Sequence, residues 1–345
     1  MNKRSSSHGS SSENEKESWP KMLDNRYLIL KNLGGTVNTM AHLVKDVTCS
    51  ETLVIKIAEK GEKEGLEQEY DFLTSFEHPN IIKPHIFVSE GLITYDDDKK
   101  ELTPKTDEEA VASDNLWAYF TLKFHENGDF FENISRGGPV HEGIARYYFN
   151  QLVNAVEYIH NKNIAHRDIK LDNILIDDAS QLILIDFGFA EEVGSKKLVK
   201  LDDEELARAT GTKGYISPEQ VVNDGSEPIW PKKCDIFALG VVLFIMVKGV
   251  APFDMPTRED EYYQYMIMKK KNYFWKAHQK KRRNFTNKAY NILSYEVKSL
   301  ISDLLSPNPK ERPDISEIKE HPWFQKSDIL SDEEIRKLMS ERVLS

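Results

Sequence analysis

The chain has 345 residues, and its 46 Lys and Arg residues are outnumbered by 57 Asp and Glu residues, which leaves a net charge of −11. This acidic balance argues against general nucleic-acid binding, because contacts to phosphates need clustered positive charge. Two cysteines are too few for a disulfide framework or a cysteine zinc site. The longest apolar run, residues 238–247, is too short to span a bilayer. The composition therefore predicts a globular intracellular protein, in the cytoplasm and without membrane insertion.

The first part of the chain is predicted to consist mostly of strands. Residues 1–25 form a Ser-rich tail without apolar periodicity, for which we expect disorder. Alternating apolar and polar residues over 27–35, 39–46 and 52–57 predict an antiparallel meander. A first helix is expected over 62–76, because its apolar residues are spaced by four and three.

Residues 89–116 differ in composition from the sequence around them. They contain nine acidic residues against three lysines. We interpret this segment as a solvated insertion between two strands, and a docking site is the alternative interpretation.

From residue 143 onward the pattern becomes mainly helical. One long apolar face runs from 144 to 159, and two short apolar strands are expected at 174–176 and 182–185. An apolar helix at 236–247 is followed by further helices up to residue 324. The change from strands to helices near residue 125 predicts the α+β class, with a small β-rich lobe before a larger helical lobe.

Residues 325–345 are predicted to form an amphipathic helical tail. Ser331 and Glu334 have the spacing of a capping box. The apolar stripe that follows consists of Ile335, Leu338, Met339 and Val343. We expect this helix to pack on the helical lobe of its own chain.

The strongest chemical signal is the segment HRDIKLDN at 166–173, followed by DFG at 186–188 and SPE at 217–219. In order and spacing, these three segments resemble the catalytic loop, the metal-binding motif and the APE-type segment of the eukaryotic protein kinase family. The lysine two residues after Asp168 is similar to that of the serine/threonine type. The resemblance covers about residues 26–324.

This resemblance implies a bilobal protein kinase-like fold, with an N-lobe over about 26–124 and a C-lobe over about 125–324. It also implies the use of ATP and Mg²⁺, because phosphoryl transfer depends mainly on positioning and on charge neutralisation. We therefore expect a protein kinase domain between the Ser-rich tail and the C-terminal helix.

The resemblance assigns roles to five residues near the reacting groups. Asp168 is expected to accept the proton of the substrate hydroxyl, and Lys170 to neutralise the γ-phosphate. Asn173 and Asp186 are the expected Mg²⁺ ligands, since this ion prefers carboxylate and phosphate oxygens. Thr212 resembles the threonine that bonds the catalytic Asp and Lys in serine/threonine kinases.

Lys56 resembles the lysine that holds the α- and β-phosphates of ATP, although a surface lysine on an edge strand is the alternative. Its expected partner is Glu69, which lies three residues after Leu66 and four before Leu73, on the buried face of the first helix. Glu67 is turned about 100° away from Leu66, towards solvent. The predicted ion pair is therefore Lys56–Glu69.

The glycine-rich segment departs from the family pattern. The first glycine, Gly34, is in place, whereas Thr36 and Thr39 stand where the family has glycines. Glycines allow the backbone to approach phosphate closely, so this change affects ATP binding. The residues of the segment that we still expect near ATP are Leu33, Gly34, Gly35 and Ala41.

The resemblance also implies a pocket for the adenosine part of ATP. Val54 stands where the family usually has Ala against the adenine, and Leu175 is expected to form the opposite wall. The backbones of Lys123 and His125 are expected to bond the adenine. Asp129 either reaches the ribose or caps the next helix.

Three residues are expected to support the site without touching substrate. Glu219 is expected to pair with Arg312, and Asp235 to hold the backbone of the catalytic loop.

Charged residues bear on substrate choice and regulation. Asp172 and Asp129 are placed to attract a basic residue upstream of the target hydroxyl, although Ile245 stands where strongly basophilic relatives carry another acid.

In many relatives the activating phosphosite lies at the position of Arg208 in this chain, and Thr210 is the nearest residue that could be phosphorylated.

We favour activity that does not depend on phosphorylation. The acidic run at 202–205 is predicted to neutralise Arg167 in place of a phosphate.

Residues 269–283 contain eight basic side chains and no acid, interleaved with Tyr273, Phe274 and Trp275. One interpretation is a patch for an acidic partner or nucleic acid. The favoured interpretation is an exposed helix face with the aromatic side chains turned inward.

The sequence as a whole predicts a monomeric serine/threonine protein kinase that uses MgATP on protein substrates. A pseudokinase that acts as a binding scaffold is the alternative favoured by the altered glycine segment. Retention of all five residues Lys56, Glu69, Asp168, Asn173 and Asp186 favours the enzyme. A small-molecule or lipid kinase is disfavoured by the GT and SPE segments, which shape a peptide-docking surface.

Overall fold

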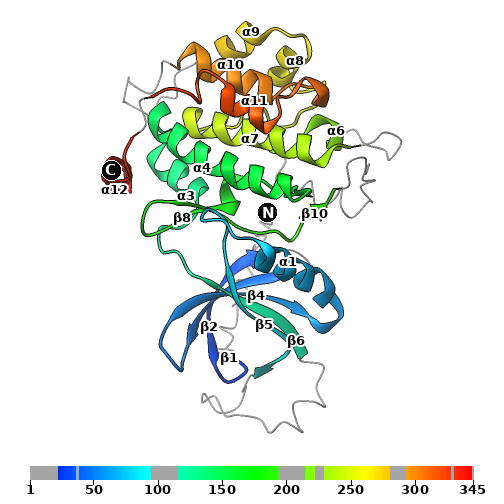
Figure 1. The fold of residues 1–345 in the computed structure, drawn as a ribbon, viewed down its shortest axis with the longest axis vertical. Helices are drawn as coiled ribbons and strands as arrows, with labels where there is room; N and C mark the ends of the chain where they lie inside the picture. Colours follow the sequence, from blue (N-terminus) through cyan, green and yellow to red (C-terminus); the bar gives the residue numbers. More distant parts are fainter. Residues whose placement is uncertain are drawn as a thin grey trace, which may run out of the picture. The chain divides into compact units, whose positions relative to one another are not determined.

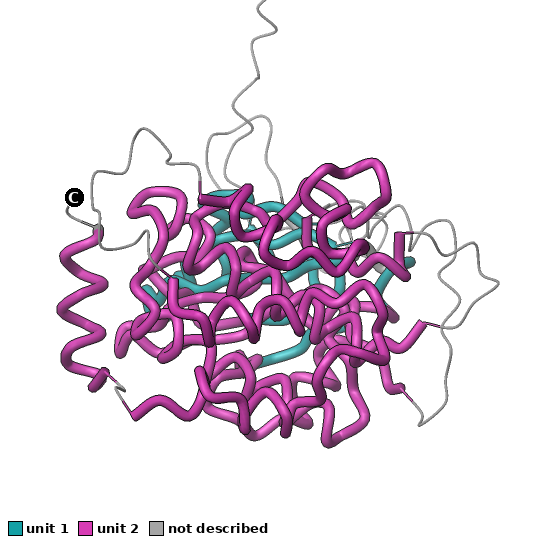
Figure 2. The backbone as a smooth tube through the Cα atoms, turned by 90° about the horizontal axis from the view of Figure 1, so that it is seen from above, with its two compact units in different colours: residues 1–63, 86–121 teal, residues 64–85, 122–345 magenta. Residues whose placement is uncertain are grey.

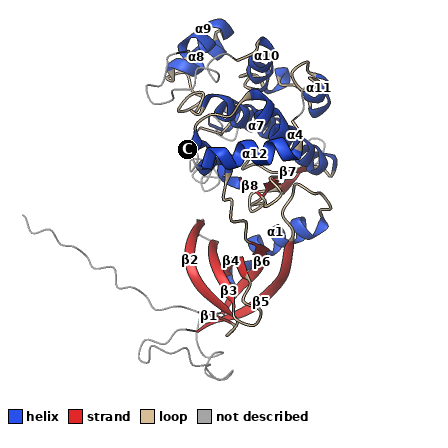
Figure 3. Cartoon of the chain, turned by 90° about the vertical axis from the view of Figure 1, so that its left-hand side faces the viewer, coloured by secondary structure: helices blue, strands red, loops and turns tan. Residues whose placement is uncertain are grey.

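The computed structural model describes residues 22–35, 39–94, 116–193, 214–221, 229–279, 293–327 and 330–343. The chain divides into two compact units, residues 1–63 with 86–121 and residues 64–85 with 122–345 (Figure 2). Strands dominate the first unit and helices the second (Figure 3). This confirms the predicted α+β class and the order of a β-rich lobe before a helical one.

The strands of the first unit close into a barrel in the order β1-β2-β3-β4-β6-β5 (Figure 1). These strands are β1 (Met22–Leu23), β2 (Tyr27–Gly35), β3 (Met40–Asp46), β4 (Thr52–Glu59), β5 (Pro84–Thr94) and β6 (Leu116–Lys123). The consecutive strands β2, β3 and β4 pair antiparallel, which confirms the predicted meander.

The core of this unit follows from the alternation of side chains along its strands. Leu53, Ile55 and Ile57 of β4 are all buried, and they pack with Val44 and Tyr119. The residues between them on β4, Val54 and Lys56, are half-buried on the other face. The alternation thus separates a core face from a face that carries predicted ATP-binding residues.

The predicted disorder of residues 1–25 is wrong for its last four residues. Met22 and Leu23 form β1, which pairs with β2 and β5 and is buried. Asp24 accepts hydrogen bonds from the Leu92 backbone N–H (2.6 Å) and from the Tyr119 hydroxyl (2.6 Å). A two-residue strand has no readable periodicity, so its partners in the barrel determine its structure. Residues 1–21 lie outside the described residues.

The predicted insertion at 89–116 is narrower than expected. β5 continues to Thr94 because its end pairs with β1, with Met22 opposite Thr94 and Leu23 opposite Ile93. Residues 95–115 lie outside the described residues, so the choice between a solvated loop and a docking site stays open.

The second unit consists mainly of helices. They are α1 (Lys63–Ser75), α3 (Phe130–Gly137), α4 (Glu142–Asn161), α6 (Pro218–Val221), α7 (Pro231–Lys248), α8 (Glu261–Ile267), α9 (Lys271–Ala277), α10 (Tyr295–Leu304), α11 (Ile315–Glu320) and α12 (Asp332–Val343). Short 3₁₀ helices are η1 (Lys60–Glu62), just before α1, η2 (Leu171–Asn173) and η5 (Pro309–Glu311). Two small antiparallel sheets pair β8 (Ile174–Ile176) with β9 (Leu182–Leu184), and β7 (Ile164–Ala165) with β10 (Glu191–Glu192).

Helix α7 lies in the centre of this unit. It packs against α4 and α10 and is buried along nearly its whole length, which explains why its sequence is apolar on all sides. In the described part of the chain, neither α7 nor any other helix combines the length and hydropathy needed to cross a bilayer.

The C-terminal helix α12 confirms the prediction for the tail. The Glu334 side chain accepts from the Ser331 backbone N–H (2.8 Å), and Ser331 Oγ accepts from the Glu334 backbone N–H (3.3 Å). Ile335 and Met339 are buried, and Arg342 donates to backbone carbonyls just after α3. The helix therefore packs on its own unit through its apolar stripe.

The structure confirms part of the favoured interpretation of the basic segment at 269–283, namely an exposed helix face with the aromatic side chains turned inward. Phe274 and Trp275 of α9 are buried, whereas Tyr273 is exposed and stacks on Tyr265 with ring centroids 6.1 Å apart. Residues 280–283 lie outside the described residues. Trp275 turns inward because its indole N–H donates to Ser302 of α10 (3.0 Å).

Candidate active site

The loop between β7 and β8 brings three predicted site residues together. Asp168 Oδ2 accepts hydrogen bonds from Lys170 Nζ (2.7 Å) and from Asn173 Nδ2 (2.8 Å). Asn173 Nδ2 also donates to the Asp168 carbonyl (2.9 Å). The carboxylate of Asp168 is thus held by two donors on the same oxygen.

Asp235, on the buried helix α7, holds the backbone of this loop as predicted. Its carboxylate accepts from the backbone N–H groups of His166 (2.9 Å) and Arg167 (2.8 Å). The His160 ring contacts the same carboxylate at 2.8 Å, a contact that the sequence analysis did not identify. Arg167 has a φ of +67°, a left-handed conformation that a non-glycine residue adopts only when its surroundings hold it.

The ring of His166 connects the catalytic loop to the segment before Asp186. Its Nδ1 accepts from the Asp168 backbone N–H (3.3 Å), and its Nε2 donates to the Ile185 carbonyl (3.2 Å). Burial lowers the pKa of His166, which favours the neutral ring that this pattern of one acceptor and one donor requires. The ring acts as a spacer between the two motifs.

The residues after Ile185 are held by α1. The Phe187 backbone N–H donates to Glu69 Oε1 at 3.0 Å, and the Phe187 ring packs against Phe76 (5.2 Å) and His166 (4.6 Å). Asp186 has a φ of +63°. Helix α1 therefore holds the DFG segment through one hydrogen bond, and Phe76, the residue after the helix, adds an aromatic contact.

The predicted orientation of the first helix is confirmed. Glu69 is 2% exposed on the inner face of α1, whereas Glu67 is exposed. Lys56 belongs to the first unit and Glu69 to the second. The Lys56–Glu69 ion pair stays a prediction.

The environment of Asp168 suits a proton acceptor. Burial raises the pKa of its carboxyl group above the usual value, and the nearby Lys170 ammonium acts in the opposite direction. A carboxylate of raised pKa is a stronger base than an exposed one.

The predicted adenosine-binding residues of the second unit lie on neighbouring segments. Asp129 caps α3, since its Oδ1 accepts from the Glu132 backbone N–H at 2.6 Å, which confirms the capping interpretation. Asp129 also forms a backbone bridge with Leu175 of β8. His125 is buried, and burial lowers the pKa of its ring, whereas Lys123 is exposed. The ribose role of Asp129 stays a prediction.

In the first unit, the predicted ATP-binding residues form a row across the sheet. Ala41 of β3 lies opposite Lys56 of β4 and opposite Gly34 of β2. Residues paired across antiparallel strands share a face, and Val54, two residues before Lys56, lies on the same face. The strand register therefore groups these four residues on the face opposite the core.

The hairpin between β2 and β3 contains the altered glycine segment, and its geometry explains why a glycine stands at position 35. A side chain at Gly35 would place its Cβ 2.2 Å from the Thr39 carbonyl oxygen and 2.7 Å from Met40 Cα. Gly35 therefore allows the close approach of the two strands. Leu33 lies in a β-bulge between Asn32 and Gly34 and is 43% exposed. Thr36 lies outside the described residues.

The SPE segment is anchored as predicted. Arg312 is buried, and its guanidinium donates to both carboxylate oxygens of Glu219, each at 2.6 Å. Bidentate pairs of this kind are strong and directional. Thr212, Thr210 and Arg208 lie outside the described residues, so their predicted roles stay predictions.

The carboxylate that contacts Arg167 belongs to Glu191, which no sequence motif marked. Arg167 Nη1 lies 2.8 Å from Glu191 Oε2, in the strand that follows the DFG segment. The predicted partners at 202–205 lie outside the described residues. Two adjacent acids at 191–192 were the available signal, but neither periodicity nor motif spacing marks one of them as a partner.

The residues present fit a Mg²⁺ ion that is shared with a nucleotide. Among the described residues, no three His, Cys, Asp or Glu side chains form a group that could hold a metal by themselves. Mg²⁺ is commonly bound by one or two protein oxygens together with substrate phosphates. Asp186 offers a carboxylate, and Asn173, whose amide nitrogen is bonded to Asp168, offers its Oδ1.

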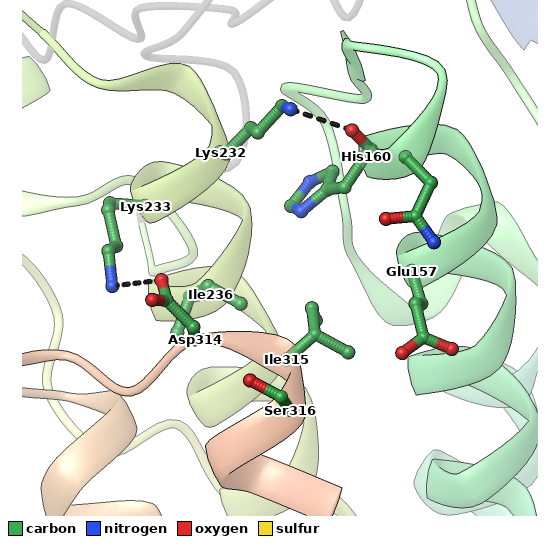
Figure 4. A pocket seen from close by; sticks show the side chains of 9 residues that line it. Glu157, His160, Lys232, Lys233, Ile236, Asp314, Ile315 and Ser316 are labelled. Carbon is green, nitrogen blue, oxygen red and sulfur yellow. Dashed lines mark hydrogen bonds and ion pairs between the residues drawn. The ribbon is translucent and has the colours of Figure 1, made fainter. Parts of the chain in front are cut away.

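A separate cavity of about 280 Å³ lies between α4, α7 and α11 (Figure 4). Lys232 Nζ donates to the His160 carbonyl (2.6 Å), and Lys233 Nζ lies 2.7 Å from Asp314 Oδ1. Both lysines that line it are thus bonded within the protein. His160, which lines the cavity, also contacts Asp235, the residue that holds the backbone of the catalytic loop.

Comparisons with known proteins show what the chain as a whole is similar to. Residues 27–324 match the family model of the protein kinase domain. CBL-interacting protein kinase 15 of Oryza sativa subsp. japonica is 27% identical over 335 residues, which cover 95% of this chain and 65% of the relative. Serine/threonine-protein kinase SAPK2 of the same subspecies is 29% identical over 315 residues, which cover 88% of this chain and 77% of the relative.

CBL-interacting protein kinase 11 of that subspecies is 28% identical over 311 residues, with 88% of this chain and 52% of the relative covered. The chain therefore spans between half and two thirds of the length of these CBL-interacting relatives.

Proposed function

Since residues 27–324 match the protein kinase domain, the chain belongs to the protein kinase family, and we propose that it is an active serine/threonine protein kinase. It would transfer the γ-phosphoryl group of ATP, bound with Mg²⁺, to Ser and Thr hydroxyls of protein substrates. The observation that carries this proposal is the contact of Asp168 with both Lys170 and Asn173. A pure scaffold has no need of this arrangement.

Asp168 is the proposed proton acceptor. Its Oδ2 is occupied by Lys170 and Asn173, so we assign Oδ1 to the substrate hydroxyl. Removal of that proton raises the nucleophilicity of the hydroxyl oxygen as it approaches the γ-phosphorus.

Lys170 and Asn173 have supporting roles in this step. Lys170 is 19% exposed, and its ammonium group is the proposed partner of the transferred phosphoryl group. Asn173 fixes the rotamer of Asp168 through two hydrogen bonds from one amide nitrogen. The substrate is thereby positioned by groups that are ordered before it binds.

Asn173 Oδ1 and the Asp186 carboxylate would hold the magnesium ion. When bound, this ion neutralises negative charge on the phosphates of ATP. The chain itself sets the position of Asp186 through the hydrogen bond between Phe187 and Glu69.

The first unit supports ATP as the phosphoryl donor. Ala41, Val54 and Lys56 share one face of the sheet beside Gly34, so a cation and two small apolar groups are available together. The hairpin keeps a close backbone approach through Gly35. We therefore propose that the altered glycine segment still binds the phosphates.

For the substrate, we propose a preference for a basic residue upstream of the target hydroxyl. Asp172 is an exposed residue of η2, and Asp129 caps α3, which packs against η2. Burial raises the pKa of Asp129, and the negative charge of Asp172 acts in the same direction. If Asp172→Ala leaves the preference on a peptide array unchanged, this substrate proposal is wrong.

We further propose that the kinase acts as a monomer in the cytoplasm. Of its two free cysteines, Cys49 is exposed, which suits a reducing compartment.

The experiment that tests the proposal measures phosphate transfer from MgATP to a generic basic protein, beside the variant Asp168→Asn. Transfer to Ser or Thr that is lost in the variant is the expected result. Absence of transfer from wild-type protein, with and without prior phosphorylation by an activating kinase, would favour the scaffold. A thermal shift with MgATP would then show whether nucleotide still binds.

A further inference from the structure

Arg167 and Glu191 form an ion pair beside the candidate active site. The distance between Arg167 Nη1 and Glu191 Oε2 is 2.8 Å, and the two side chains are 13% and 22% exposed. Such a pair is more strongly held than one on the open surface, because water screens it less. Removing one partner would leave a charge that is partly shielded from solvent.

The backbone fixes Glu191 at this place. Glu191 lies opposite Ala165 in the sheet of β7 and β10, and the Val193 backbone N–H donates to the Asn163 carbonyl at 2.7 Å. A turn closed by the Ala190 backbone N–H and the Phe187 carbonyl (2.9 Å) leads into this strand. The pair therefore connects the segment after DFG with the start of the catalytic loop.

Arg167 is the residue directly before Asp168, and its backbone conformation is unusual. At a φ of +67° it needs to be held by its surroundings. Its backbone N–H donates to Asp235 at 2.8 Å, and its guanidinium lies on Glu191. The residue is thus held at both ends, by one carboxylate on α7 and by another on β10.

We infer that Glu191 is a positioning residue for Asp168, acting through Arg167. The negative charge that fixes this arginine is then encoded in the sequence and does not have to be added as a phosphoryl group. The inference rests on the proposed kinase function, and it extends that function to how the active state is maintained.

The adjacent residue offers a matched control. Glu192 is exposed and, as the next residue of the same short strand, points to the opposite face. Glu191→Gln and Glu192→Gln make the same chemical change one residue apart. A difference between them reports on the contact with Arg167 and not on total charge.

The experiment uses full-length protein that has been treated with phosphatase and verified by mass spectrometry to be unphosphorylated. Wild-type protein is expected to stay active in this form. We expect Glu191→Gln to lower kcat about tenfold with little change in the KM for ATP, since small displacements of a reacting group have large effects on rate. Glu192→Gln should match wild type, and Glu191→Asp should restore part of the loss.

A double-mutant cycle tests whether the effect passes through the arginine. In an Arg167→Met background, Glu191→Gln should cause no further loss of kcat, because the contact is already absent. Equal kcat values for Glu191→Gln and Glu192→Gln would overturn the inference. Loss of activity on dephosphorylation of the wild type would overturn it as well.

Hydrogen exchange gives a second readout that does not depend on catalysis. We expect the backbone amides of Arg167 and Asp168 to exchange faster in Glu191→Gln than in Glu192→Gln. If this difference is found while no variant or wild type transfers phosphate, the positioning role stands and the proposed kinase function fails. If exchange is equal and wild type transfers phosphate, the inference fails alone.

Discussion

The catalytic loop at 166–173 and the hairpin around Gly34 and Gly35 differ in what holds them and in how closely they follow the family pattern. Every chemically important residue of the loop follows the family pattern, whereas the hairpin keeps one glycine at its usual place. The loop is held by side chains, with Asp168 bonded to Lys170 and Asn173. The hairpin is held by backbone pairing of β2 with β3.

The contrast between the loop and the hairpin indicates at which positions the identity of the residue is restricted. A side chain that accepts or donates a specific hydrogen bond has few substitutes. Backbone pairing tolerates many side chains, except where two backbones approach closely, as Gly35 and Thr39 do. The loop should therefore be sensitive to conservative changes, and the hairpin should be sensitive at few positions.

The largest effect is expected from a substitution in the catalytic loop. Asp168→Asn keeps the shape of the side chain but removes the proton acceptor, so kcat should fall about 10³-fold. Unfolding temperature should change little. The control Asp71→Asn makes the same change at an exposed site on α1. A variant Asp168→Asn with near wild-type kcat would show that another group accepts the proton.

The next largest effect is expected at the ion pair between Arg312 and Glu219 in the second unit. Arg312→Met removes a buried guanidinium that holds Glu219, and it should lower the free energy of unfolding by about 3 kcal/mol. That corresponds to a fall of roughly 6–12 °C in the unfolding temperature. Arg336→Met, on the exposed side of α12, is the control. Equal unfolding temperatures for the two variants would contradict this expectation.

An ion pair in the first unit allows a comparison that depends on pH. The Arg26 side chain holds the pKa of the buried Asp46 carboxyl well below its usual range, and bonds from Thr48 act in the same direction. A depressed pKa stabilises the folded state above the unfolded pKa of about 4, and this contribution is lost as the pH falls.

Asp46→Asn should therefore lower the free energy of unfolding by about 2 kcal/mol at pH 7. The difference from wild type should shrink as the pH falls below about 4. Glu51→Gln, which removes one negative charge at an exposed residue of the same unit, is the control. A difference that stays constant down to acid pH would argue against the ion pair as its cause.

The smallest expected effect concerns the hairpin. Gly35→Ala forces the two strands apart, so the KM for ATP should rise severalfold while kcat changes less. Gly65→Ala is the control, because nothing lies within 4 Å of a Cβ at this helical position. That control should raise the free energy of unfolding by up to about 1 kcal/mol. If the KM for ATP is unchanged in Gly35→Ala, the hairpin has no part in nucleotide binding.

Much of the fold could be predicted because its signals are local. The apolar periodicity of α1 predicted that Glu69 is buried and Glu67 exposed, and the alternation along β4 separated its core face from Lys56. The capping box at Ser331 predicted the start of α12. Each of these patterns lies within one element, where the geometry of the helix or strand determines which residues share a face.

The order of elements, the family and the residues of the catalytic loop could all be predicted, because motif spacing and periodicity are properties of short segments. Long-range contacts, by contrast, place Met22 and Leu23 in a strand and make Glu191 a partner of Arg167. Those contacts join segments that are separated in the chain. They depend on which strands pair and in which register, and no local pattern encodes that choice.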